Sequence, residues 1–144
     1  MNPNTEPASA EQVRDLARIG FLAVHVGEPA AARAIFTSLM VLRPDSVLPH
    51  IGRAMAEQAA GRMDEAVRWL RDEGLRQHPD DPELMAFLGL ALVQAGWSSQ
   101  AAPLLRRVAK LADADGAHVR MARELLQRSA PGAPFPAPFV PTLH

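Results

Sequence analysis

The sequence has no cysteine and no tyrosine among its 144 residues, and aromatic residues make up only 5% of it. The lack of cysteine excludes a disulfide framework, thiol catalysis and a cysteine-based metal site. Neither sign of charge dominates, because 15 basic and 16 acidic residues leave a net charge of −1. Such a balance gives no electrostatic reason to expect nucleic acid or an anionic membrane surface as the partner.

Long apolar runs are also missing. No stretch approaches the roughly 20 apolar residues that a membrane-spanning helix needs. The first residues, MNPNTEPASAEQ, lack the basic start and the apolar run of a signal peptide. We therefore expect a cytoplasmic protein that does not insert into a membrane.

Alanine and leucine are common, whereas β-branched residues other than valine are few. This composition favours helices, and 48% hydrophobic residues supply enough apolar surface for the core of one domain. The sequence therefore predicts an all-α fold.

A repeat of about 34 residues runs through the chain. Gly27, Gly61 and Gly96 each stand between two apolar segments, and their numbers differ by 34 and 35. A small residue comes seven positions before each glycine, an alanine five positions after it, and a large apolar residue four positions later still. This period predicts recurring helix–turn–helix units. In chain order the small residues are Gly20, Ala54 and Gly89, the alanines are Ala32, Ala66 and Ala101, and the apolar residues are Phe36, Leu70 and Leu105.

The spacing has a physical reason. Two antiparallel helices approach closely only where both side chains are small, and the glycine between them ends the first helix in the left-handed conformation. One such unit cannot bury its own apolar face, so the units must stack. We place them at residues 13–46, 47–81 and 82–115, with one extra residue in the middle unit between Ala66 and Pro79.

Capping patterns agree with these boundaries. Ser9 and Gln12 form a capping-box pattern at the start of the first helix, within an N-terminal segment of residues 1–12. Asp81 and Pro82 suit the N-cap and first position of a later helix. Pro103 must lie in or just past the first turn of its helix, because deeper inside it removes a hydrogen bond.

Two segments follow the repeats. Residues 116–128 place Val119, Ala122, Leu125 and Leu126 on one stripe, which predicts a capping helix with a polar outer face. Residues 129–144 contain five prolines and predict an extended, disordered tail.

The 34-residue unit resembles the tetratricopeptide repeat over residues 13–115. The resemblance implies a right-handed superhelical solenoid of three helix–turn–helix repeats plus a C-terminal capping helix. It also implies a concave face lined by the first helix of each unit, which is where such proteins bind peptides. The implied groove residues are Ala17, Phe21, Val24 and His25 in the first unit, Leu48, Ile51, Met55 and Gln58 in the second, and Ala86, Leu90, Val93 and Gln94 in the third.

This set is mostly apolar. Tetratricopeptide domains that serve heat-shock chaperones clamp a terminal carboxylate with basic and amide side chains, and the matching positions here carry no cation. We therefore expect an apolar or amphipathic peptide segment in the groove, where a methionine adapts to varied side chains. The alternative is that the N-terminal segment, the tail or a second copy of the chain covers these residues.

No pattern in the sequence supports catalysis, a metal or a cofactor. The five histidines lack the i, i+4 pairing of a helical metal site. Neither a glycine-rich phosphate loop nor a nucleophile elbow occurs. We expect no catalytic, metal-binding or cofactor-binding residue.

A closer resemblance is to the tetratricopeptide chaperones of bacterial type III secretion. It rests on an A-x-x-I-F-x-x-L-x-x-L run, a Pro-Asp turn and a glycine-containing helix with a glutamine before the next turn glycine. The resemblance implies a protein client, namely a secreted translocator, needle or filament subunit, and it leaves open a co-chaperone or a homodimer. The alternative is a generic scaffold or adaptor in a bacterial complex. The residues concerned are Ala32, Ile35, Phe36, Leu39, Leu42, Pro44, Asp45, Gly52, Gln58 and Gly61.

Overall fold

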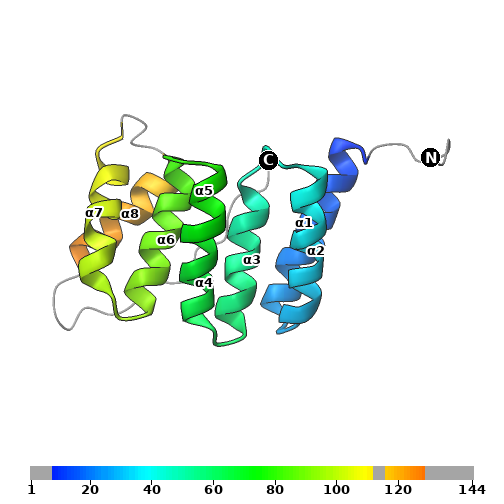
Figure 1. Cartoon of the computed structure of the whole chain (residues 1–144), viewed down its shortest axis with the longest axis horizontal. Helices are drawn as coiled ribbons and strands as arrows, with labels where there is room; N and C mark the ends of the chain where they lie inside the picture. Colours follow the sequence, from blue (N-terminus) through cyan, green and yellow to red (C-terminus); the bar gives the residue numbers. More distant parts are fainter. Residues whose placement is uncertain (1–7, 112–115, 129–144) are drawn as a thin grey trace.

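Helices follow one another through the computed structural model, which describes residues 8–111 and 116–128. Within these residues there is no strand, so the all-α class predicted from the sequence is confirmed. Figure 1 shows the helices as a row of antiparallel neighbours, from α1 and α2 at one end to α7 and α8 at the other. The helices are α1 (Ala10–His25), α2 (Pro29–Leu42), α3 (Leu48–Ala59), α4 (Met63–Trp69), α5 (Leu75–Gln77), α6 (Pro82–Gln94), α7 (Ser98–Ala109) and α8 (Ala117–Arg128), with a π-helical turn at Leu70–Gly74.

The three glycines of the repeat end α1, α3 and α6 in the same way. Gly27, Gly61 and Gly96 have φ values of 81°, 77° and 85°, so each lies in the left-handed region that the sequence predicts. The first of these turns shows the hydrogen bonds of a Schellman motif. The Gly27 N–H donates to the Val24 carbonyl at 3.2 Å, and the Glu28 N–H donates to the Ala23 carbonyl at 2.8 Å. The same two bonds recur at the other two glycines, which makes these turns structural copies of one another.

The helix starts follow their caps. The Gln12 N–H donates to Ser9 Oγ at 3.2 Å, and the Gln12 side chain accepts from the Ser9 N–H at 2.8 Å, which completes the predicted capping box. Asp81 Oδ1 accepts from the Leu84 N–H at 2.9 Å at the start of α6. Pro103 lies in the second turn of α7, just past the first turn as expected.

The extra residue of the middle unit has a structural explanation. Leu70–Gly74 form a π-helical turn, in which the Leu75 N–H donates to the Leu70 carbonyl, five residues back. A π-turn is the usual way in which a helix accommodates one inserted residue. The insertion lies between Ala66 and Pro79, as the spacing predicts, and Leu70 keeps its place in the core at 1% exposure.

Phe36 connects the first hairpin to the next helix. Its side chain is fully buried, and it packs against Gly20 of α1 and Gly52 of α3. A Cβ atom added at either glycine would overlap the Phe36 ring. Small residues therefore let a large ring fill the layer between hairpins, and Leu105 fits against Gly89 in the same manner.

The two ends of the row differ. At the α7 end, α8 packs on α6 and α7 and buries Val119, Ala122 and Leu125, which confirms the apolar stripe predicted for this helix. The α1 and α2 end has no comparable covering helix among the described residues (Figure 1). The predicted tail, residues 129–144, and most of the segment before Ser9 lie outside the described residues. None of the described helices is long and apolar enough to cross a membrane.

Candidate functional site

The first helices of the hairpins lie side by side. Helix α3 contacts α1 on one side and α6 on the other. Across the second junction, Gln58 Nε2 donates a hydrogen bond to Gln94 Oε1 at 2.9 Å. The helices that carry the groove residues named from the sequence are therefore neighbours in space.

These residues differ in how much of each side chain reaches the surface. Four are buried, and their side chains contribute to the floor beneath the face. His25 is exposed at the end of α1. The others are half-buried, so part of each side chain is open to a ligand. The buried four are Ala17, Ile51, Ala86 and Leu90, and the half-buried seven are Phe21, Val24, Leu48, Met55, Gln58, Val93 and Gln94.

The apolar members fall into two adjoining clusters. Phe21, Val24 and Leu48 pack with the buried residues of the first hairpin, where the Phe21 and Phe36 rings meet edge to face with centroids 4.9 Å apart. Met55 and Val93 pack instead on the larger cluster of the middle and last hairpins. Helix α3 contributes to both clusters, so it joins the two halves of the face.

A hollow of about 330 Å³ opens at the α1 end of this face. Ala17 and Leu48, which the sequence places in the groove, both line it. The other lining residues come from α1, from the loop between α2 and α3, and from the start of α3. They are Ala10, Val13, Arg14, Arg43, Asp45 and Ser46.

The positions that match carboxylate-clamp residues carry no cation, but this hollow holds two arginines from other positions. Arg14 and Arg43 both line it. Arg14 lies on the first helix of the first repeat, at a position that the repeat pattern points toward the groove. Arg43 lies just after the end of α2, outside the helices that carry the groove residues. The clamp residues of carboxylate-binding tetratricopeptide domains lie on helices, so a match to their positions does not include a loop arginine such as Arg43.

Glu83 lies half-buried in the first turn of α6. Burial raises the pKa of its carboxyl group, the nearby Asp81 carboxylate raises it further, and His118 lowers it. The raised pKa favours the protonated, neutral form of Glu83.

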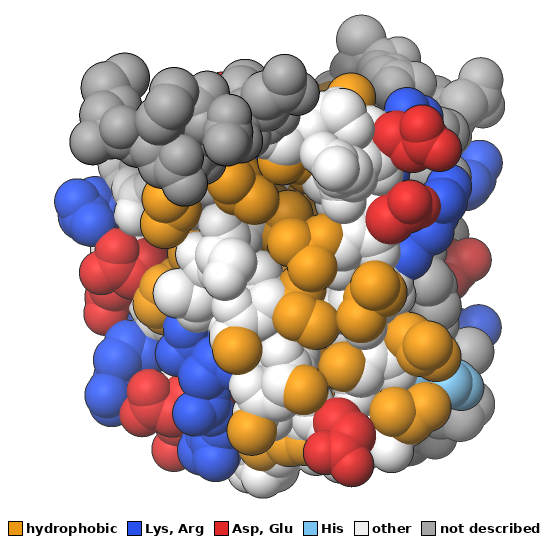
Figure 2. Space-filling view, turned by 90° about the vertical axis from the view of Figure 1, so that its right-hand side faces the viewer, with side chains coloured by type: hydrophobic (Ala, Val, Ile, Leu, Met, Phe, Trp, Pro, Cys, Tyr) orange, Lys and Arg blue, Asp and Glu red, His pale blue; other side chains and the backbone are white. Residues whose placement is uncertain are grey.

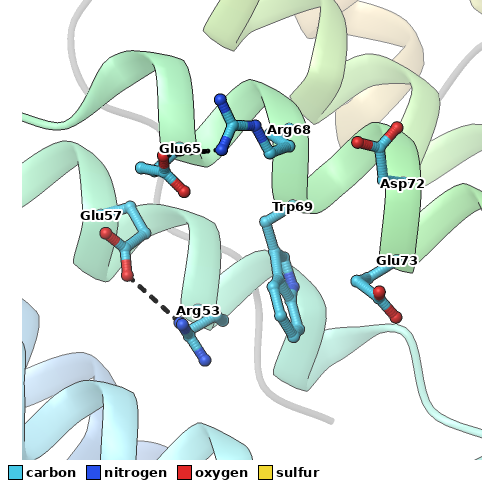
Figure 3. A pocket seen from close by; sticks show the side chains of 7 residues that line it. All are labelled: Arg53, Glu57, Glu65, Arg68, Trp69, Asp72 and Glu73. Carbon is cyan, nitrogen blue, oxygen red and sulfur yellow. Dashed lines mark hydrogen bonds and ion pairs between the residues drawn. The ribbon is translucent and has the colours of Figure 1, made fainter.

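A charged cluster lies on the opposite side of α3. The Glu57 side chain is only 5% exposed and accepts from three arginines, with distances of 2.9 Å to Arg33 Nε, 3.3 Å to Arg53 Nε and 2.6 Å to Arg62 Nε. The Arg53 guanidinium also lies 4.5 Å from the centre of the Trp69 ring. Figure 3 shows Arg53, Glu57 and Trp69 at the edge of a 250 Å³ pocket. Because the arginines compensate the buried carboxylate, the cluster is explained as a structural one.

Next to it, His50 is 2% exposed and stacks on Trp69 with ring centroids 5.9 Å apart, while the His78 ring lies 5.5 Å away. Three buried nitrogens have no hydrogen-bond partner among the described residues, namely His50 Nδ1, Trp69 Nε1 and His78 Nε2. Burial lowers the pKa of His50, the neighbouring His78 lowers it further, and Glu73 and Gln77 raise it. Burial therefore favours the neutral form of this histidine.

One sign of this cluster is visible in the sequence, because Arg53 stands where tetratricopeptide repeats commonly have a leucine. Periodicity cannot reveal that Glu57 attracts arginines from three different segments. Within residues 8–111 and 116–128, no three histidine, aspartate or glutamate side chains are grouped so that they could hold a metal ion.

These features define an all-helical protein of stacked hairpins with a partly open apolar face on its first helices. No protein-family model matches the chain, and no curated protein matches it. Solved structures of the chaperone PcrH do share its fold. PcrH bound to the chaperone-binding region of PopB is 20% identical with a TM-score of 0.67, over 85% of this chain and 98% of that one. PcrH from Pseudomonas aeruginosa is 19% identical with a TM-score of 0.66, over 88% and 97%. The predicted resemblance to a tetratricopeptide-like translocator chaperone of type III secretion is thus confirmed as a likeness in fold.

Proposed function

We propose that this protein is a non-catalytic chaperone of a bacterial type III secretion system, acting in the cytoplasm. Its architecture is a right-handed solenoid of three tetratricopeptide repeats, at residues 13–46, 47–81 and 82–115, closed by the helix at 116–128. Support comes from the three identical Schellman turns and from the fold shared with PcrH.

The client is a segment of a secreted translocator, needle or filament subunit. The observation that carries this proposal is that PcrH, which has the same fold, binds the chaperone-binding region of PopB. On this chain the proposed binding surface is the face of α1, α3 and α6, where Phe21, Met55 and Val93 are half-buried, so that part of each side chain is accessible. An apolar or amphipathic client segment lies along this face and is hidden from self-assembly until secretion.

The energetics are adequate for such a role. Burying about 500 Å² of apolar surface contributes roughly 12 kcal/mol before costs. Ordering the client segment and losing its translational freedom consume much of that sum. The resulting affinity lies between micromolar and nanomolar, which allows the client to be released for export.

Co-expression tests the proposal. The client is first identified by purifying the protein from its native cell, and it is then produced with wild type, Met55→Asp or Val93→Asp. We expect both variants to keep their helicity and to lose the client from the soluble fraction. Thr37→Asp, on an exposed position of α2, serves as the matched control and should retain it. Phe21→Asp is less informative, because Phe21 also packs on Phe36. Retention of the client by both groove variants would contradict the assignment.

A generic scaffold that joins two proteins is the second candidate. It shares the helical fold but does not protect its partners. The two are separated by expressing the partner alone, since a chaperone's client should aggregate without it and a scaffold's partner should stay soluble.

A further partner is expected at the α1 and α2 end. Ile19, Leu22 and Val26 of α1 are 54%, 58% and 61% exposed, and Val41 of α2 is 80% exposed. Figure 2 shows hydrophobic side chains gathered on this end face. Solenoids need a polar surface on their terminal units, so this face requires a cover, and we assign it to a second copy of the chain. The alternative is that a co-chaperone covers this face, and measuring the oligomeric state of the protein distinguishes the two.

A further inference from the structure

Two arginines in the hollow at the α1 end lack the ion pairs that most other arginines make. Seven arginines of the described chain pair with carboxylates, namely Arg18, Arg33, Arg53, Arg62, Arg68, Arg76 and Arg107. Among the described residues, the Arg43 guanidinium forms no hydrogen bond or ion pair although it is half-buried. Arg14 makes only a long 3.4 Å bond, from its Nε to the Ala10 carbonyl. Two guanidinium groups with free donors therefore share one 330 Å³ hollow.

The rest of the hollow is suited to an aliphatic group. Val13, Ala17 and Leu48 line it and belong to the apolar cluster of the first hairpin. Asp45 is the only acid among the described residues of its wall, so these residues give the hollow a net positive charge. Ser46 Oγ already accepts from the Leu48 N–H at 3.3 Å, which leaves charge as the main polar feature of the hollow.

We propose that this hollow is a carboxylate anchor, in which Arg14 and Arg43 bind an acidic group of a peptide whose neighbouring aliphatic side chain packs on Val13 and Leu48. The ligand class follows from the two parts of the wall, because guanidinium groups pair with carboxylates through directed hydrogen bonds. A phosphate is disfavoured, since its second negative charge would face Asp45.

The inference rests on the proposed function in one respect, which is that the peptide is part of the chaperone's client. The hollow lies at one end of the face formed by α1, α3 and α6, and the repeat register points Glu83 inward at the α6 end. An acidic residue of the client therefore binds at the α1 end and is disfavoured at the other. The anchor fixes the direction of a bound segment that apolar contacts alone would leave ambiguous.

The carboxylate has two sources, an acidic side chain or a free chain end, and three capped tripeptides separate them. The first is acetyl-Leu-Glu-Leu-amide, the second is acetyl-Leu-Gln-Leu-amide, and the third is acetyl-Leu-Gln-Leu with a free carboxylate. Each is titrated into the full ¹⁵N-labelled chain, while the Nε–H resonances of Arg14 and Arg43 and the amide resonances of Ala17 and Leu48 are followed. The variants are Arg14→Gln/Arg43→Gln and, as a matched control, Arg106→Gln, which removes an exposed arginine of α7.

We expect at least one carboxylate peptide to shift these resonances and to bind more tightly than the uncharged peptide. The difference should be up to about fivefold for each arginine, which is the contribution of a solvent-accessible ion pair. It should shrink at high salt, disappear in the double variant and remain in Arg106→Gln. The peptide that shifts the signals identifies the source of the carboxylate.

Equal binding of all three peptides, no binding of any, or an unchanged preference in the double variant would overturn the anchor. Failure of the chaperone proposal looks different. In that case Met55→Asp and Val93→Asp would keep the client while the tripeptides still distinguished acid from amide at the hollow.

Discussion

The two ends of the helical row bear similar amphipathic stripes, but the structure uses them in opposite ways. In α8 the apolar stripe is covered, with Val119 and Ala122 at 0% exposure, while Arg123 and Glu124 face solvent. At the other end, the stripe of Ile19, Leu22 and Val26 is open. The apolar stripe at the first end is covered by other helices of the chain, and the stripe at the second end is left exposed.

This difference shows what a periodic pattern reports. An i, i+3, i+7 spacing of apolar residues states that a helix has one apolar side. It does not state whether that side meets the same chain, another chain or water. Substitutions in the apolar stripes should therefore change the free energy of unfolding by different amounts at the two ends.

The largest effect is expected at the closed end. Val119→Asp buries an unpaired carboxylate against α6 and α7 and should lower the free energy of unfolding by about 3–5 kcal/mol. Ile19→Asp is the matched change at the open end and should cost less than about 0.5 kcal/mol in the monomer. Urea unfolding at low protein concentration, followed by circular dichroism, measures both. Equal losses at the two ends would remove the distinction between them.

A smaller effect is expected where the open-end hairpin joins the rest. Gly52→Ala places a methyl group against the Phe36 ring and should cost about 1–3 kcal/mol through overpacking. The same unfolding experiment applies. Phe36→Leu is the paired control, because a smaller side chain makes room for the methyl group. The double variant should lose less than the sum of the single losses, and strict additivity would argue against the contact.

Lowering the pH should reduce the stability of the protein through a histidine of the middle repeat, which belongs to neither end. The pKa of His50 is lowered in the folded protein by burial and by His78, so the unfolded chain takes up a proton first as the pH falls below about 6.5. Stability is then full above that pH and declines below it, by at most about 1.4 kcal/mol per pH unit until the folded pKa is reached. Unfolding free energies between pH 7 and 5 measure the slope.

Two variants identify the residue that causes this pH dependence of stability. His50→Asn should flatten it, while His25→Asn, at an exposed histidine, should leave it unchanged. A slope that persists without His50 would place the titrating group elsewhere.

The smallest effect on stability should accompany a large effect on association. Leu22→Glu adds a charge to an open surface and should change the free energy of monomer unfolding by less than about 0.5 kcal/mol. It should also convert a dimer to a monomer, as measured by light scattering during size-exclusion chromatography. A wild-type protein that stays monomeric at high concentration would refute the second copy as the cover of this face.

Much of the fold was predictable because it depends on local rules. Gly27, Gly61 and Gly96 mark turns that only a residue tolerant of positive φ adopts readily. Ser9 and Asp81 are found where unpaired backbone N–H groups need acceptors. The inserted residue was located by counting, although its π-helical form depends on packing that the sequence does not display.

The remaining features depend on contacts between distant segments. Arg43 reaches the hollow from a loop, so a register of helix positions omits it. Glu57 gathers arginines from α2, α3 and the turn before α4, and only the folded chain brings them together. The open stripe of α1 was missed because, in sequence, it has the same pattern as a buried one.

Photo-crosslinking in the native cell shows whether the face of α1, α3 and α6 holds a segment of a secreted subunit. A photoreactive amino acid is placed at Met55 or, as control, at Arg68, an exposed residue of α4. We expect a crosslink from Met55 to one secreted subunit, mapped to an apolar segment, and none from Arg68. No adduct from Met55, or the same adduct from both positions, would contradict this expectation.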